Sequence, residues 1–309
     1  MENVAHPERG ITYVACYFAL WTLMLGLLWA FTSFNLSEAI SALVVLGLVF
    51  PALSWLCTRS QSSLPIAVRD ANLESLLLIL YLLAVVWVIV FGFERVARIS
   101  AEPLHSVVLL IVKLVVFVLI PAGLIAKVGH YSFRDMMPTS LKPRALLPAL
   151  WMSLAVLLMQ AFLGRGLRDI RGAHQSASAL MFAAPLCFVW LMLEVGVVEE
   201  FFFRVLLQER LARGVHSQWG GLVSASLLFG LVHAPGFYLR PAATQEALGA
   251  HPSLLLAIGY SVVLTSLAGL FLGVLWMRTK NFVVIVIVHA AGDLLPNLLP
   301  WTHSFHLVR

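Results

Sequence analysis

Long, nearly uninterrupted apolar runs dominate the chain and follow one another at short intervals. A membrane-spanning helix needs about 20 predominantly apolar residues. The runs of this kind lie at 11–34, 39–57, 75–93, 106–128, 145–164, 182–207, 220–238, 254–277 and 282–299. None of them alternates apolar and polar positions as a barrel strand does, and lipid leaves the backbone no partner except itself, so helices are expected. The pattern predicts an all-α, polytopic transmembrane helical bundle with eight or nine spans, since the second and ninth runs are short.

The overall composition excludes a water-soluble core. Of 309 residues, 61% are hydrophobic and 11% charged, whereas soluble domains are about a quarter charged. The net charge of +5 comes from basic residues scattered between the apolar runs, which is typical of loops beside a bilayer and not of a nucleic-acid surface. We therefore expect the lipid bilayer as surroundings and no nucleic-acid partner. The first run is too long for a signal peptide and is interpreted as a retained span.

Ionisable residues are unevenly distributed among the predicted spans. Before Ala145 the spans hold almost none beyond Lys113, whereas after Leu193 they hold a series. The series consists of Glu194, Glu199, Glu200, Arg204, His233, His289 and Asp293. A charged side chain at mid-bilayer costs at least about 2.5–3.5 kcal/mol on insertion scales, so several together indicate a site. We predict N-terminal spans over residues 1–144 and a site-bearing domain over residues 145–309.

The first motif is an acid pair followed by an arginine, Glu199-Glu200-x-x-x-Arg204. On an α-helix Glu200 and Arg204 share one face at i and i+4, so Glu200 can neutralise the guanidinium. Glu199 points about 100° further round the helix and remains as a candidate general base for water. A purely structural Glu200–Arg204 ion pair is the simpler alternative for these two residues. Glu194 is a weaker candidate for the same site.

Two further motifs place a histidine one helical turn from another residue. They are Phe229-x-x-x-His233 and His289-x-x-x-Asp293. An acid one turn from a histidine can fix its tautomer and orientation. Taken alone, His233 is more often a core histidine, and a His–Asp pair is more often a hydrogen bond between helices. All three motifs in successive apolar spans favour a functional site.

This order of motifs resembles the CPBP (Abi) family, which comprises CAAX prenyl endopeptidases and their bacterial relatives, over roughly residues 145–300. The resemblance implies a glutamic-type intramembrane endopeptidase that needs no cofactor or metal. It further implies that Glu199 and His233 activate a water, that His289 and Asp293 stabilise the oxyanion, and that Arg204 and Phe229 support the site. Family members often have Asn where this chain has Asp293. An ionised Asp cannot donate a hydrogen bond, so it would orient His289 or act protonated.

Several alternatives stay open beside the peptidase. Two histidines and a glutamate could bind zinc, although the chain lacks His-Glu-x-x-His and its histidines lie on different spans. A non-catalytic immunity or scaffold protein could keep the same pocket. Intramembrane acids and histidines also occur in proton relays and transporters. Inverted repeats would favour a transporter, and the sequence shows no internal symmetry. The loop at 240–251 is interpreted as a gate or a connector.

The expected substrate is a membrane-embedded peptide or protein. A short peptide or a C-terminal anchor or sorting segment fits a bacterial chain better than a prenylated protein. The expected location is the bacterial cytoplasmic (inner) membrane, crossed many times. The N-terminal spans are expected to form a substrate-docking surface.

Overall fold

The computed structural model describes residues 7–61, 66–96, 101–137, 139–173, 175–239, 248–249 and 251–307, which form helices and no strand. Within this part of the chain, nine helices are long and apolar enough to cross a membrane. They are Gly10–Phe31, Leu36–Cys57, Ala71–Val90, Leu104–Gly129, Pro143–Phe162, Ala177–Gly214, Gln218–Leu239, Leu254–Thr279 and Phe282–Ser304. The predicted polytopic helical bundle is confirmed, and the described residues hold nine helices of spanning length.

The two runs that looked short gain length at their ends. The second begins at Leu36 because the Asn35 side chain accepts a hydrogen bond from the Ser37 N–H and caps α2 (Leu36–Ala42). The ninth, α16 (Phe282–Ser304), continues past its apolar part through Pro296 and Pro300. Both helices thus include flanking residues that an apolar count leaves out.

Several spans change from α-helix to π-helix along their length. The π-helical segments are η1 (Leu43–Val49), η2 (Val115–Leu119), η3 (Met192–Val197), η4 (Phe201–Gln208) and η7 (Ser261–Thr265). π-Helical turns are rare and occur frequently at functional sites. The acid pair lies in the short α11 (Val198–Glu200), between η3 and η4. A run that is apolar on all sides shows no period, so its sequence cannot reveal these turns.

By contacts, the chain divides into two compact units. The first unit comprises Met1–Leu56, Ile66–Phe93 and Phe203–Arg278, and the second comprises Cys57–Pro65, Glu94–Phe202 and Thr279–Arg309. Each unit is therefore assembled from distant parts of the sequence. The predicted division into 1–144 and 145–309 describes where ionisable residues occur, and it stays a prediction.

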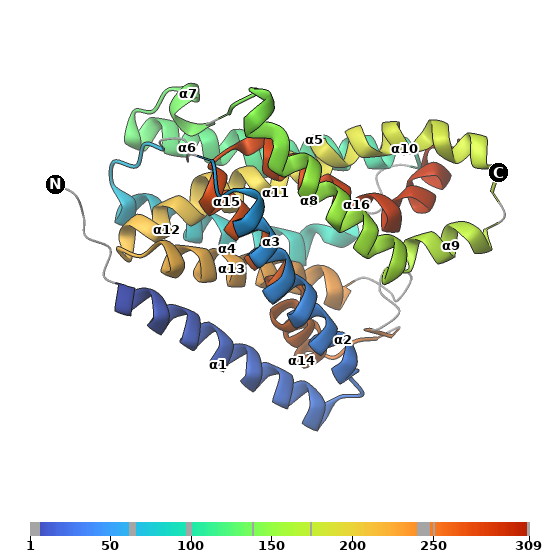
Figure 1. The fold of residues 1–309 in the computed structure, drawn as a ribbon, viewed down its shortest axis with the longest axis horizontal. Helices are drawn as coiled ribbons and strands as arrows, with labels where there is room; N and C mark the ends of the chain where they lie inside the picture. The colour runs from blue at the N-terminus through green and yellow to red at the C-terminus, as the bar shows by residue number, and fades with distance from the viewer. Residues whose placement is uncertain are drawn as a thin grey trace. The chain divides into compact units, whose positions relative to one another are not determined.

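In the first unit, α1 (Pro7–Phe31) packs against α13 (Gln218–Leu239), α14 (Leu254–Tyr260) and η7 (Figure 1). Tyr17 Oη lies 2.7 Å from Ser266 Oγ, and Trp21 Nε1 donates to the Val263 carbonyl at 2.9 Å. The polar tips of these aromatic side chains are thus satisfied inside an apolar core, as buried tyrosine and tryptophan require.

In the second unit, α16 packs against α8 (Pro143–Phe162), α9 (Gly166–Gly172) and α10 (Ala177–Leu191) (Figure 1). Their shared core consists of Ala183, Cys187, Leu191, Ala290 and Leu298. Small side chains dominate this core, and small residues allow helices to approach closely where lipid offers no hydrophobic drive for association. The close packing places α16 where it can present its histidine to the acid pair.

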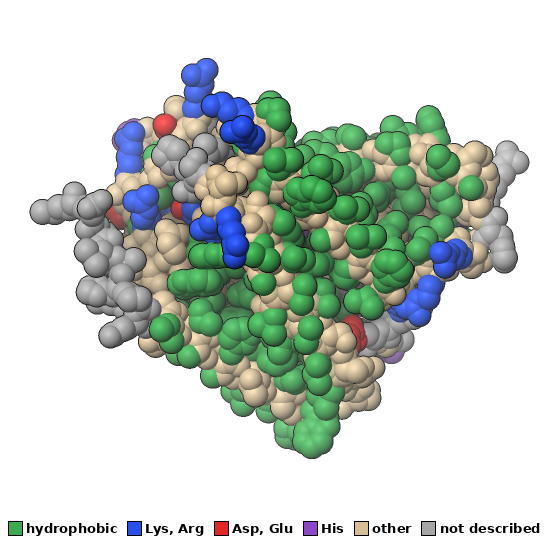
Figure 2. Space-filling model, in the orientation of Figure 1, with side chains coloured by type: hydrophobic (Ala, Val, Ile, Leu, Met, Phe, Trp, Pro, Cys, Tyr) green, Lys and Arg blue, Asp and Glu red, His purple; other side chains and the backbone are tan. Residues whose placement is uncertain are grey.

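Many large hydrophobic side chains are exposed on the outside of the described helices. Figure 2 shows one face, on which hydrophobic side chains predominate and Lys and Arg gather at a few places. Large apolar side chains are widely exposed, among them Phe162 at 82%, Met181 at 79% and Trp87 at 64%. Contiguous exposure on this scale needs an apolar partner, and with nine spanning-length helices that partner is lipid. The protein is a multi-pass integral membrane protein.

Candidate active site

The acid pair presents two differently placed carboxylates. The Glu200 side chain is fully buried, while Glu199 keeps 20% of its side chain exposed. Burial without water requires a hydrogen-bonding partner for a polar group. Glu200 therefore has to bond within the protein, whereas Glu199 can also be reached from outside.

His289 on α16 faces both acids. Its Nδ1 lies 2.8 Å from Glu200 Oε1, and its Nε2 lies 3.8 Å from Glu199 Oε2 and 3.6 Å from Asp293 Oδ2. An ionised carboxylate only accepts, so Nδ1 carries the hydrogen that Glu200 binds. From the sequence, Asp293 was expected to orient His289 or to act protonated, and this role stays a prediction. The Nδ1–H of His289 donates to Glu200, and Asp293, with 37% of its side chain exposed, lies on the side of the opposite ring nitrogen.

A glycine lets the two helices approach closely enough for this bond. A Cβ built on Gly196 in η3 would lie 2.9 Å from the Val286 carbonyl oxygen and 3.0 Å from Val286 Cγ1. Gly196 precedes Glu200 by one helical turn, and Val286 precedes His289 on α16. The contact therefore sets the separation between the acid pair and the histidine.

Replacing Gly196 by alanine is expected to push η3 and α16 apart and to lengthen the His289–Glu200 bond. Overpacking of this kind costs about 1–3 kcal/mol of stability. A misplacement of reacting groups by about 1 Å can cost up to about 100-fold in rate, so if these residues form the peptidase site that the motifs predict, we expect roughly a tenfold loss of cleavage. Initial cleavage rates and thermal unfolding in detergent measure both effects. Gly123→Ala, in α6 (Ile120–Gly129), has open space at its Cβ and is the matched control; equal rates for both variants would contradict the spacing role.

A second cluster of predicted residues lies in the first unit. The Arg204 guanidinium carbon is 4.7 Å from the centre of the Phe229 ring, a cation–π contact. The Phe229 and His233 rings are 5.0 Å apart, and His233 Nδ1 lies 2.7 Å from the Phe229 carbonyl oxygen. A carbonyl only accepts, so Nδ1 carries the hydrogen and Nε2 keeps the lone pair that could accept a proton. Phe229 thus contacts both Arg204 and His233.

The predicted residues therefore form two clusters. One consists of Glu199, Glu200, His289 and Asp293, and the other of Arg204, Phe229 and His233. Each cluster lies within one compact unit. The predicted cooperation of Glu199 with His233 stays a prediction. The predicted gate or connector at 240–251 falls mostly on residues outside the described part of the chain.

Glu194 pairs with a residue that the sequence left unassigned. Lys113 Nζ, on α5 (Leu104–Leu114), lies 2.8 Å from Glu194 Oε1, and Trp190 Nε1 donates to the other carboxylate oxygen at 2.5 Å. Opposite charges on two apolar spans were the available signal, since each is costly without the other. These contacts favour a structural role for Glu194, five residues before the acid pair, and its part in the site stays a prediction.

Metal ligation has no candidate among the described residues. No group of three or more His, Cys, Asp or Glu side chains there has an arrangement that could hold a metal ion. In the acid cluster, the His289 Nδ1 position is taken by its bond to Glu200. The absence of a metal from the reaction remains a prediction, which a chelator tests.

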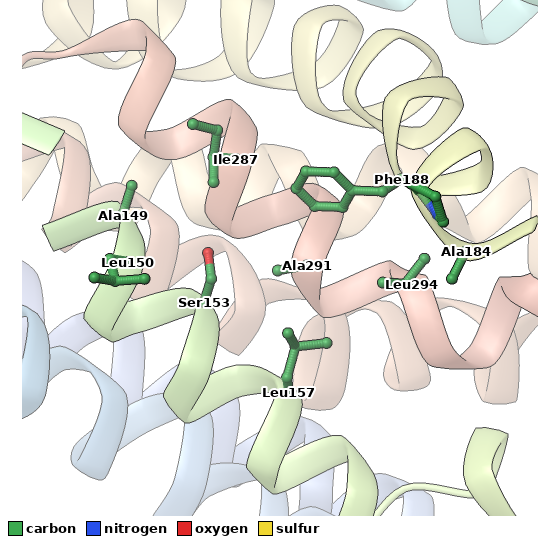
Figure 3. A pocket seen from close by; sticks show the side chains of 10 residues that line it. Ala149, Leu150, Ser153, Leu157, Ala184, Phe188, Ile287, Ala291 and Leu294 are labelled. Atoms are coloured by element: carbon green, nitrogen blue, oxygen red, sulfur yellow. The ribbon is translucent and has the colours of Figure 1, made fainter. Parts of the chain in front are cut away.

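A cavity of about 370 Å³ lies in the second unit between α8, α10 and α16 (Figure 3). It is lined by Ala149, Leu150, Ser153, Leu157, Ala184, Pro185, Phe188, Ile287, Ala291 and Leu294. At 3.6 residues per turn, the three lining residues of α16 lie about 140–200° around the helix from His289. The cavity thus lies behind the acid cluster, on the opposite face of α16.

Comparison with known proteins supports the motif assignment. Residues 178–295 match the family model described as type II CAAX prenyl endopeptidase Rce1-like. No curated protein and no solved structure matches the chain. The matched segment contains all seven predicted site residues and starts after α8, so it is shorter than the range of 145–300 expected from the motifs. The match over residues 178–295 to an Rce1-like family model supports an intramembrane CAAX-type protease in general.

Proposed function

We propose that the protein is a glutamic-type intramembrane endopeptidase that uses Glu199 as its general base. The observation that carries the proposal is the acid cluster itself. It places a partly exposed carboxylate and a buried carboxylate on either side of one imidazole, in spans where each charge is costly. The family match to residues 178–295 supports the same class of reaction.

Glu199 takes a proton from a water molecule in the proposed reaction. The resulting hydroxide adds to the scissile carbonyl carbon, and the carbonyl oxygen becomes an oxyanion. The intermediate then collapses: the C–N bond breaks, and the amine leaves with the proton that Glu199 returns. The family resemblance assigns His233 to the same water, and its Nδ1–H bond to Phe229 leaves Nε2 as the proton-accepting atom.

His289 is proposed to stabilise the oxyanion. When protonated, the ring donates from both nitrogens: Nδ1–H to Glu200 and Nε2–H towards the developing charge. Asp293 lies 3.6 Å from Nε2, where as a carboxylate it would hold the imidazolium and as a carboxylic acid it would donate to the oxyanion. Arg204 and Phe229 support the site from the second cluster.

The proposed substrate is a membrane-embedded peptide or the C-terminal anchor or sorting segment of a protein. The proposed location is the bacterial cytoplasmic membrane. The widely exposed apolar side chains of the spans support a substrate that is delivered from the bilayer, since a soluble peptide would have to cross that apolar surface to reach buried groups.

The test is cleavage of tagged membrane peptides by the purified protein in liposomes, with products mapped by mass spectrometry. Wild type and His233→Ala are compared, each with and without a zinc chelator. We expect cleavage by wild type that resists the chelator, and a strong loss in His233→Ala. Chelator-sensitive cleavage would instead favour the zinc-dependent variant. A wild-type protein that binds peptides from a broad panel and cleaves none would favour the non-catalytic immunity or scaffold protein.

A further inference from the structure

A proline opens the hydrogen-bond ladder of α16 at the proposed site. Pro296 lies inside the helix and has no N–H, so it cannot donate to the carbonyl of Gly292 four residues earlier. Gly292 lies between His289 and Asp293. The carbonyl that loses its ladder partner is therefore in the turn that carries both residues of the third motif.

A side chain from another helix supplies the missing donor. Gln160 Nε2 donates to the Gly292 carbonyl oxygen at 3.0 Å. Gln160 lies in the last turn of α8, outside the matched segment 178–295. A backbone carbonyl without a donor costs several kcal/mol in a bilayer, and polar side chains from neighbouring helices commonly satisfy groups freed by proline. Gln160 thus replaces the hydrogen bond that Pro296 removes.

The same turn is held at two further points. A Cβ on Gly166, the first residue of α9, would lie 2.4 Å from the Leu295 carbonyl oxygen and 2.7 Å from Pro296 N, so the backbones touch there. Asn297 Nδ2 donates to the Asp293 carbonyl at 2.8 Å. Sharp helix kinks usually occur at proline, and these contacts restrict bending of α16 at Pro296.

We infer that Gln160 is a positioning residue of the proposed active site. It acts through the backbone of Gly292 and fixes the turn from which His289 reaches Glu200 and Asp293 faces Nε2. The inference rests on the proposed peptidase function. Loss of the Gln160 donor frees the turn to rotate, and small displacements of a catalytic group are costly in rate.

A double-mutant cycle between Gln160 and Pro296 tests the inference on the full-length protein in liposomes. Gln160→Met removes the donor at similar length, and Pro296→Ala returns an N–H to the ladder. We expect Gln160→Met to lower kcat about tenfold with little change in KM. In the Pro296→Ala background the same substitution is expected to change kcat less than twofold. Gln218→Met, an exposed position at the start of α13, is the control.

The outcomes distinguish a failure of the positioning role from a failure of the proposed function. Wild-type cleavage that is unchanged by Gln160→Met, or a loss of the same size in both backgrounds, overturns the positioning role and leaves the peptidase standing. Absence of cleavage by wild type overturns the proposed function and this inference with it. If Gln160→Met alone does not fold, Pro296→Ala is compared with the double variant: equal kcat supports the role, and a tenfold loss overturns it.

Discussion

Replacement of Glu199 by glutamine is expected to lower the rate of cleavage by about 10²- to 10⁴-fold, the usual contribution of a general base. Glutamine keeps the size of the side chain but cannot take a proton from water. Glu199 is the acid with 20% of its side chain exposed, and it lies 3.8 Å from His289 Nε2. A water molecule can therefore reach this carboxylate. The protein is expected to remain folded, because the substitution leaves the fully buried carboxylate of the neighbouring Glu200 unchanged.

Glu200→Gln is the informative comparison for this prediction. Glu200 is fully buried and accepts the Nδ1–H bond of His289, and a glutamine oxygen can still accept it. A neutral acceptor is weaker than a charged one by about 1 kcal/mol, so the expected loss is roughly fivefold. Cleavage rates and unfolding of both variants are measured beside Glu102→Gln, an exposed acid before α5. If Glu200→Gln loses more than Glu199→Gln, the two acids have the opposite roles.

The spans were predictable because one physical requirement determines them. Lipid demands long apolar helices, and the nine helices of the structure overlap the nine runs of the sequence. The π-helical turns around Glu199 and Glu200 were not predictable, because Val and Phe on all sides of a run hide its period. The acid pair itself was visible, since charge stands out in an apolar segment.

The partners of the site residues depend on which spans touch. Within one helix, the i and i+4 spacing correctly brought His289 and Asp293 together and Phe229 beside His233. The bond of His289 to Glu200 joins residues 89 positions apart, and it requires the close approach at Gly196. Glycine and proline inside apolar runs can indicate where helices touch, and the sequence-based predictions did not use them. Gly196 marks one such helix contact.

Proline carries the second overlooked signal. Pro296 leaves the carbonyl of Gly292 without its ladder donor. The side chain that donates to this carbonyl, Gln160, lies on a different span. The pair of Lys113 with Glu194 follows the same logic, since two isolated opposite charges in apolar spans each require a partner.

Arg210→Met is expected to destabilise the protein by about 3–5 kcal/mol, because it leaves a buried charge without its partner. In the first unit, Arg210 Nε lies 2.6 Å from Glu74 Oε2, and the side chains are 2% and 0% exposed. Arg210 Nη1 also donates to the Leu206 carbonyl at 3.0 Å, and Glu74 Oε1 accepts from the Asp70 N–H. Met fills the space of the arginine stem but carries no charge, so it cannot neutralise Glu74.

Chemical unfolding in detergent measures this loss, with Arg171→Met as the control at an exposed position of α9. The double variant Glu74→Leu with Arg210→Met is expected to recover most of the stability, because removing both charges of a buried pair is often nearly neutral. Additive losses in the double variant, or no loss in Arg210→Met, would show that the pair does not carry this energy.

The same ion pair predicts what the N-terminal spans contribute. Glu74 lies before the matched segment 178–295 and Arg210 lies within it. Deletion of residues 1–129 removes Glu74 and leaves Arg210 without its counter-charge, so the truncated chain is expected to misfold whether or not these spans dock substrate. Restoring neutrality by Arg210→Met in the truncated chain is expected to recover part of the folded yield, measured as monodisperse protein in detergent. A truncated chain that folds with Arg210 intact would show that the catalytic segment is independent of the spans before it.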